Sequence, residues 1–127
     1  MASFKKYFEI QATPEELYNA LTNPLALKLW TGEEAIMSTE PNSEFSWWED
    51  SIVGRNIAFE ENKMIKQVWY FGDENPDSEV IFKFHEHKKG TSLEVSQTNI
   101  PDEDFDDVLQ GWENMIIGNL IDFFEGE

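Results

Sequence analysis

The chain has 127 residues, and 26 acidic against nine basic side chains give it a net charge of −17. The resulting negative field repels phosphate backbones and anionic lipid, so we expect neither nucleic acid nor a membrane as a partner. Cysteine is absent, which excludes disulfides, thiolate metal sites and a cysteine nucleophile. No apolar run is long enough for a signal peptide or a bilayer span. We therefore expect one cytoplasmic domain over residues 1–127.

The N-terminal part of the sequence predicts one strand and two short helices. Alternation over residues 4–10 indicates the strand. Residues 13–16, Thr-Pro-Glu-Glu, combine a capping box with proline at the first helical position, so a helix should begin there and end at Asn23-Pro24. A second helix is expected over residues 25–30, closed by Thr31-Gly32. Because helices this short cannot form a core alone, they should cover the end of a sheet.

Short alternating segments separated by turn residues follow, which is typical of an antiparallel meander. We expect six further strands, over residues 34–39, 44–48, 57–61, 64–71, 79–86 and 91–98. The intervening turns carry Pro41-Asn42, Glu49-Asp50, Glu61-Asn62, Gly72-Asp73 with Asn75-Pro76, and Lys88-Lys89-Gly90.

The C-terminal part predicts one long helix whose apolar positions recur at spacings of three and four. They are Phe105, Val108, Leu109, Trp112, Met115, Ile116, Leu120 and Phe123. A stripe this rich must lie on a large apolar surface, so we predict an α+β fold of the helix-grip type. Its order is strand, two helices, six strands and a long helix packed across the curved antiparallel sheet. Trp112 should be buried against the sheet, and Gly111 should let the helix approach a strand closely.

This architecture tends to enclose a cavity, and eleven side chains are candidates for lining it as ligand-binding residues. Each falls on an inward strand face or on or beside the helix stripe: Phe45, Trp47, Phe59, Gln67, Trp69, Phe82, Phe84, Gln97, Trp112, Met115 and Asn119. Aromatic rings either fill a core or wall a ligand site. The amides either satisfy polar groups of the protein or orient a ligand. The sequence leaves both alternatives open.

The titratable residues predict no catalytic or metal-binding set. His85 and His87 share a strand face with Lys83, and without a third histidine or a cysteine they are expected to be exposed. The acidic residues between 102 and 107 lack the ligand pattern of a calcium loop and suit a helix start, where negative charge is stabilised. Motifs for a nucleophile elbow, a phosphate-binding loop or a zinc protease are missing from the sequence. We therefore expect no enzyme, no cofactor and no metal.

The order of elements resembles the helix-grip superfamily that includes START domains and birch-pollen-allergen-like (SRPBCC) proteins. More closely, the chain is similar to the Aha-type, C-terminal domain of the activators of the heat-shock protein 90 ATPase. The similarity runs through nearly the whole chain, in Thr13-Pro14-Glu15-Glu16-Leu17-Tyr18, Ile52-x-Gly54, Ile65-x-Gln67-x-Trp69, Gly90-Thr91-x-Leu93, Gln97-x-x-Ile100-Pro101 and Gly111-Trp112.

The resemblance leaves three functions open. The first is a non-catalytic binding module whose internal apolar cavity takes up a small hydrophobic molecule. The second is a chaperone-associated interaction module that binds heat-shock protein 90. The third is an enzyme of the aromatase or cyclase type that shares the superfamily fold. A monomer and a homodimer are both compatible with these functions.

Overall fold

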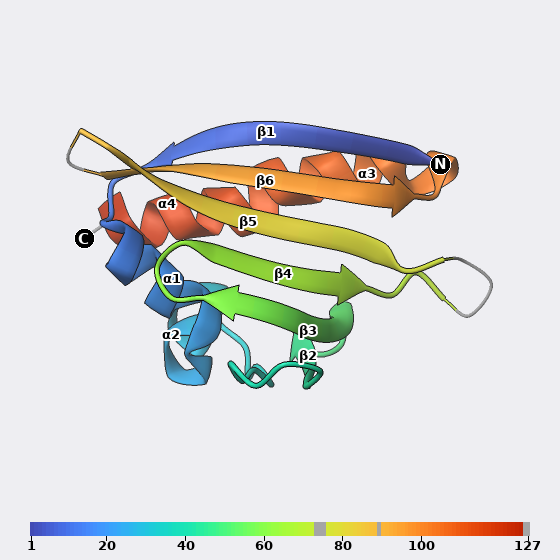
Figure 1. Cartoon of the computed structure of the whole chain (residues 1–127), viewed down its shortest axis with the longest axis horizontal. Coiled ribbons are helices and arrows are strands. Elements are labelled where there is room, and N and C mark those ends of the chain that lie inside the picture. Colours follow the sequence, from blue (N-terminus) through green and yellow to red (C-terminus); the bar gives the residue numbers. More distant parts are fainter. Residues whose placement is uncertain (73–75, 89, 126–127) are drawn as a thin grey trace.

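The computed structural model describes residues 1–72, 76–88 and 90–125 (Figure 1). Over these residues, the six strands of one antiparallel sheet are ordered β1-β6-β5-β4-β3-β2. They are β1 (Ala2–Ile10), β2 (Glu44–Trp47), β3 (Ile52–Glu60), β4 (Met64–Trp69), β5 (Ser78–His87) and β6 (Gly90–Ile100). The C-terminal helices run along one face of this curved sheet, behind β5 and β6 in the view of Figure 1. The predicted α+β helix-grip class is confirmed.

Local capping determines where the two N-terminal helices begin. In α1 (Pro14–Thr22), the Thr13 hydroxyl accepts from the Glu16 backbone N–H at 3.1 Å, and the Glu16 carboxylate accepts from the Thr13 N–H at 2.9 Å. The predicted capping box is therefore present, a device that contributes about 1 kcal/mol. Helix α2 (Pro24–Thr31) is capped by the Asn23 side chain and ends at Gly32, whose φ of 82° suits glycine.

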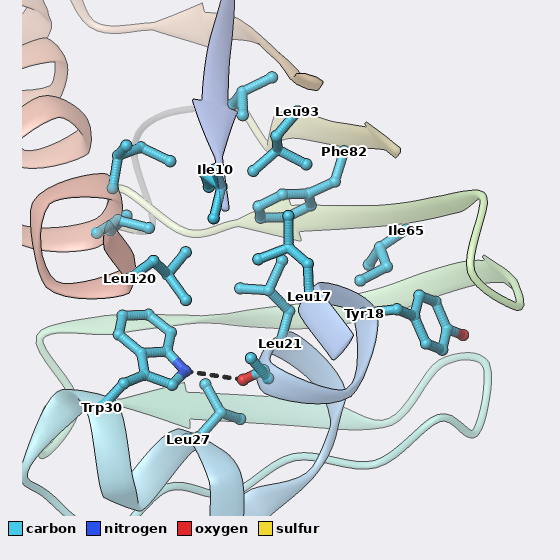
Figure 2. Close-up of a cluster of buried hydrophobic side chains, with 14 of the residues drawn as sticks. Ile10, Leu17, Tyr18, Leu21, Leu27, Trp30, Ile65, Phe82, Leu93 and Leu120 are labelled. Carbon is cyan, nitrogen blue, oxygen red and sulfur yellow. Dashed lines mark hydrogen bonds between the residues drawn. The ribbon is translucent and has the colours of Figure 1, made fainter. Parts of the chain in front are cut away.

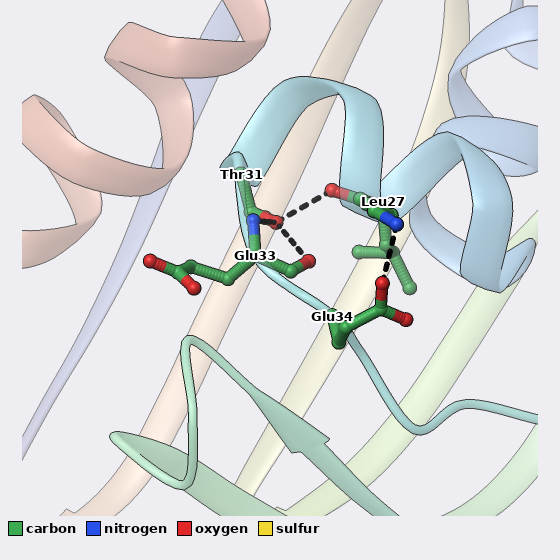
Figure 3. Close-up of polar contacts among 5 residues, drawn as sticks. Leu27, Thr31, Glu33 and Glu34 are labelled. Carbon is green, nitrogen blue, oxygen red and sulfur yellow. Dashed lines mark hydrogen bonds and ion pairs between the residues drawn. The ribbon is translucent and has the colours of Figure 1, made fainter.

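The connection after α2 is held by local polar contacts (Figure 3). The Thr31 hydroxyl lies 2.6 Å from the Leu27 carbonyl oxygen and accepts from the Glu33 backbone N–H at 3.2 Å. The Lys28 ammonium is hydrogen-bonded to and paired with the Glu34 carboxylate, which raises the pKa of Lys28. These contacts fix how the chain leaves the helix toward β2.

Helices α1 and α2 close one end of the sheet, as predicted. Leu17, Leu21 and Leu27 are fully buried there among side chains of the sheet and of the C-terminal helix (Figure 2). Burying a leucine side chain contributes about 2 kcal/mol. The Trp30 indole N–H donates to the Ala20 carbonyl oxygen at 2.8 Å, so this buried polar group also has a partner. The two helices and the sheet therefore share one core.

Residues 34–39 differ from the prediction, because they form a single bridge instead of a strand. Ile36 pairs with Ser46 on the free edge of β2. The chain then turns inward, buries Met37, and gives the Ser38 carbonyl oxygen to the Asn56 side-chain amide at 3.2 Å. The Asn56 side chain therefore hydrogen-bonds to the backbone of this segment, where hydrogen bonds to a neighbouring strand were expected. Strand β3 is also longer than predicted, since it begins at Ile52.

Two further expectations concern turns and chain reversals. The predicted turns around residues 72–76 and 88–90 fall partly on residues 73–75 and 89, which lie outside the described residues. The turn between β2 and β3 uses three consecutive residues with positive φ, Trp48, Glu49 and Asp50. This tight reversal lets β3 pair with β2 directly, which explains its early start.

The predicted long helix is present but not uniform. A 3-10 turn, η1 (Asp102–Asp104), leads into α3 (Phe105–Gln110), a π-helical turn η2 (Gly111–Ile116), and α4 (Ile117–Glu125). Trp112 is only 1% exposed, so its predicted burial is confirmed. The expectation for Gly111 is wrong, because a Cβ atom placed there meets no atom within 4 Å. The π turn widens the helix at this point, so Gly111 faces open space and no strand.

The close backbone approach occurs instead at Gly54, where a Cβ atom would lie 1.9 Å from the Val68 carbonyl oxygen. We predict that Gly54→Ala lowers the free energy of unfolding by about 3 kcal/mol, because the β3–β4 pairing must distort. Gly111→Ala is the matched control and should raise it by about 0.5–1 kcal/mol, since alanine favours helix. Urea melts of both variants measure this. Equal effects at the two glycines would contradict the packing described here.

Candidate functional site

A groove with a volume of about 360 Å³ opens between one end of the sheet and the C-terminal helices. Three segments line it: the start of β3, the end of β4 with the residues that follow, and the stretch from η1 through η2. The lining residues are Ser51, Ile52, Val53, Trp69, Tyr70, Phe71, Asp104, Asp107, Val108, Gly111, Trp112, Met115 and Ile116. Most of them are apolar, and the groove is open to solvent on one side.

One wall of the groove comes from the ends of β3 and β4, and the other comes from the helical segment. Beyond the end of β4, the Tyr70 backbone N–H still donates to the Val53 carbonyl oxygen at 3.0 Å, which extends this wall. On the opposite wall, Gly111 has no side chain, so the space beside its Cα atom stays open. The π-helical turn that begins at Gly111 lies on the same wall. Such turns occur frequently at functional sites.

Two tryptophans form the floor of the groove. The rings of Trp69 and Trp112 stack with their centroids 5.1 Å apart and an interplanar angle of 9°. Trp112 also contacts Phe4 edge-on and Phe82 at a tilt, with centroids 6.3 and 5.5 Å away. Aromatic pairs contribute about 0.5–1.5 kcal/mol beyond the area they bury. The floor is therefore a rigid apolar surface that spans helix and sheet.

Buried amides hold both indoles in place. The Trp69 N–H donates to Gln67 Oε1 at 2.9 Å, and the Trp112 N–H donates to Gln97 Oε1 at 2.7 Å. The two glutamine NH₂ groups donate in turn to Asn56 Oδ1 and to a serine hydroxyl, each at 3.0 Å. Both glutamines thus satisfy polar groups of the protein, one of the two alternatives that the sequence left open.

The structure brings only some of the candidate binding residues together. Trp69, Trp112 and Met115 line the groove. The other eight do not line it: Phe45, Trp47, Gln67, Phe82, Phe84 and Gln97 are buried, while Phe59 and Asn119 are half-buried. Inward phase marks a residue as buried, but most buried positions lie in the packed interior. Whether the three groove residues bind a ligand stays a prediction.

Several lining residues were not candidates in the sequence. Tyr70 and Phe71 follow the last paired residue of β4, and Ser51 precedes the first residue of β3. Residues 70–71 were expected to continue the strand predicted over 64–71, but β4 ends at Trp69. Ser51 lies outside every predicted strand, so the sequence marked none of the three as a lining residue. Val108 and Ile116 were already placed on the helix stripe, each four residues from Trp112. That spacing was the one sequence signal that linked them to the groove.

The histidines lie away from the groove on the outer face of the sheet, exposed as predicted. His85 Nε2 is 2.9 Å from Glu94 Oε1. This hydrogen bond, with the charges of Lys5 and Lys83, lowers the pKa of the Glu94 carboxyl despite its burial. Among the described residues, no three histidine or carboxylate side chains gather as a metal site would require. Nor does any described helix have the length and hydrophobicity to cross a bilayer.

The family of the chain follows from a family model that matches most of its length. A family model described as "Activator of Hsp90 ATPase homolog 1-like protein" matches residues 11–125. The chain belongs to this family. The resemblance noted in the sequence is thereby confirmed, and it covers both walls of the groove.

The chain matches only part of the length of two curated relatives. An activator of 90 kDa heat shock protein ATPase homolog from Dictyostelium discoideum is 27% identical over 115 residues, which are 88% of this chain and 30% of that protein. An uncharacterized protein of Schizosaccharomyces pombe is 24% identical over 125 residues, 97% of this chain and 35% of that protein. The chain thus spans about a third of the length of these curated relatives.

Solved structures have the same fold. The crystal structure of an HSP90 activator from Plasmodium falciparum is 25% identical, with a TM-score of 0.86 and 94% of each chain covered. The solution structure of the Aha1 dimer from Colwellia psychrerythraea is 19% identical, with a TM-score of 0.84 and coverage of 99% and 98%. The second likeness shows the fold alone.

The floor of the groove in this Aha-type domain yields a stability prediction. Trp112→Phe removes the indole N–H and leaves Gln97 Oε1 buried without its donor, which costs about 1–3 kcal/mol. Trp47 is the matched control, because it is fully buried and its N–H has no partner among the described residues. Trp47→Phe loses the same ring area but no hydrogen bond. Urea melts should show the larger loss for Trp112→Phe, and the reverse order would contradict the assigned hydrogen bond.

Proposed function

We propose that this domain is a non-catalytic binding module whose groove takes up a small, mainly hydrophobic molecule. The groove itself carries the proposal. Its volume of about 360 Å³ lies within the range of small-molecule sites, about 300–1,000 Å³. Its floor rests on two stacked, buried tryptophans and is already ordered before a ligand arrives. A preordered floor lowers the entropy lost on binding.

The lining chemistry favours binding over catalysis. Among the described residues that line the groove, none is histidine, lysine or glutamate. Its acids are Asp104, which is half-buried, and Asp107, which is exposed. General acid–base catalysis requires a titratable group that reaches the substrate, with a pKa tuned by its surroundings. An enzyme of the aromatase or cyclase type therefore has less support here than a binding module.

A groove-filling variant tests the proposal. The probe is 1-adamantanemethanol, a compact neutral molecule that forms no micelles, and binding is followed by tryptophan fluorescence and thermal shift. We expect a saturable response from the native chain. Gly111→Leu should weaken binding at least tenfold. The leucine side chain would occupy part of the groove volume, and the space beside Gly111 is open enough to accept it. Gly111→Ala serves as the control for the substitution itself.

A saturable response that is unchanged in Gly111→Leu would place binding elsewhere. The absence of any response would reject the proposal for ligands of this class. A thermal melt of each variant separates loss of binding from loss of folding.

A second candidate function, association with heat-shock protein 90, is supported by the family and by one surface feature. The Dictyostelium and Plasmodium relatives are described as activators of this chaperone. In this chain, Leu25 and Leu29 are 75% and 71% exposed and lie one turn apart on α2. Exposed leucines are common singly, whereas a neighbouring pair makes a small apolar contact surface.

Retention of heat-shock protein 90 from the host of this protein tests the second candidate. The immobilised chain should retain the purified chaperone at low salt and less of it at high salt, because its charge of −17 contributes to the encounter. Leu25→Ser with Leu29→Ser should reduce retention severalfold. Ile36→Ser, at a 65% exposed isoleucine outside α2, is the matched control. No retention at low salt would reject this function.

A further inference from the structure

We infer that the groove selects hydrophobic amines, molecules with one positive charge on a compact apolar body, over neutral and anionic molecules of the same shape. This rests on the proposed function and names the ligand class of the same groove. The observation behind it is the charge on one wall. Asp104 and Asp107 both line the groove, and among the described residues no Lys, Arg or His lines it.

These two carboxylates are not neutralised by the protein. Neither side chain has a hydrogen bond or ion pair among the described residues, whereas nearby positive groups are already engaged. The N-terminal amino group pairs with Asp102 at 3.3 Å, and Lys6 pairs with Glu113 at 2.5 Å. The Met1 amino group and the Lys6 side chain are therefore both paired with acids that do not line the groove. A ligand cation would meet two carboxylates without a competing partner.

The positive end of the helix dipole does not reverse the negative potential along this wall of the groove. The macrodipole at a helix N-terminus is equivalent to about half a positive charge. Residues 102–107 carry five carboxylates, and one of them is paired with the amino terminus. The potential along this wall remains negative, and the charge of −17 over the whole chain adds to it. An anionic ligand would be repelled from the groove mouth.

An aromatic residue of the lining favours the same ligand. Tyr70 lines the groove and is 38% exposed, and the negative face of an aromatic ring attracts an ammonium group. Trp69 and Trp112 stack on each other and are buried, so they offer a ligand little ring face. An aromatic ring beside carboxylates attracts a cation through the ring quadrupole and through the charge of the carboxylates. Apart from Ser51, the remaining lining is apolar and includes Ile52 and Val108, which suit an uncharged hydrocarbon body. A molecule with several charges would leave some of them against this apolar lining.

Three probes with one shared body test the inference: 1-adamantanemethylamine, 1-adamantanemethanol and 1-adamantanecarboxylate. At low ionic strength, the amine should bind about tenfold more tightly than the alcohol, and the carboxylate most weakly. Asp104→Asn with Asp107→Asn should remove the advantage of the amine and leave the affinity for the alcohol unchanged. Asp106→Asn is the matched control, because Asp106 is exposed on the same helix and does not line the groove.

Each outcome separates this inference from the proposed function. Equal binding of all three probes overturns the charge selectivity and leaves the binding module standing. Failure of all three to bind rejects the proposed function itself. If Asp106→Asn lowers the affinity for the amine as much as the double variant does, the attraction comes from the net charge, and the inference is wrong. Thermal melts check that the variants remain folded.

Discussion

The stacking of Trp69 on Trp112 is the contact on which the rest of this end of the molecule depends. One ring comes from the sheet and the other from the C-terminal helical segment, with centroids 5.1 Å apart. Each indole N–H is bonded to a buried glutamine, so neither ring can turn without leaving an amide unsatisfied. This constraint fixes the rotation of η2 about its axis. Gly111 consequently faces the groove, and Trp112 faces the sheet.

Different elements of the chain cover the two ends of the sheet. At one end, α1 and α2 bring leucines and Trp30 into the core. At the other end, the helical segment alone meets the strand ends, and its π turn carries a glycine at the wall. Because interiors are otherwise close-packed, space remains only where no side chain is supplied. The groove is thus a consequence of element order as well as of local sequence.

The sequence predicts what depends on local periodicity and fails where tertiary contacts decide. The capping box at Thr13 and the burial of Trp112 follow from residue spacing, and both are present. The segment around Ile36 has strand-like alternation, yet the Asn56 side chain on β3 donates a hydrogen bond to its Ser38 carbonyl oxygen. Gly111 occupies a helix interior, and only the π turn shows that it borders open space. The groove was not predicted either, because β4 ends at Trp69 instead of residue 71 and Ser51 lies outside every predicted strand.

The amides beneath the floor also explain how the groove could discriminate between ligands. Gln67 and Gln97 are fully buried and spend their hydrogen bonds on the protein, so they are not free to read polar groups of a ligand. Discrimination by charge would then come from Asp104 and Asp107, the charged residues among the described groove lining. In the proposed binding module, the stacked tryptophans would determine which shapes fit, and Asp104 and Asp107 would determine which charge is preferred. Shape and charge would then depend on separate residues, so that one preference can be changed without disturbing the other.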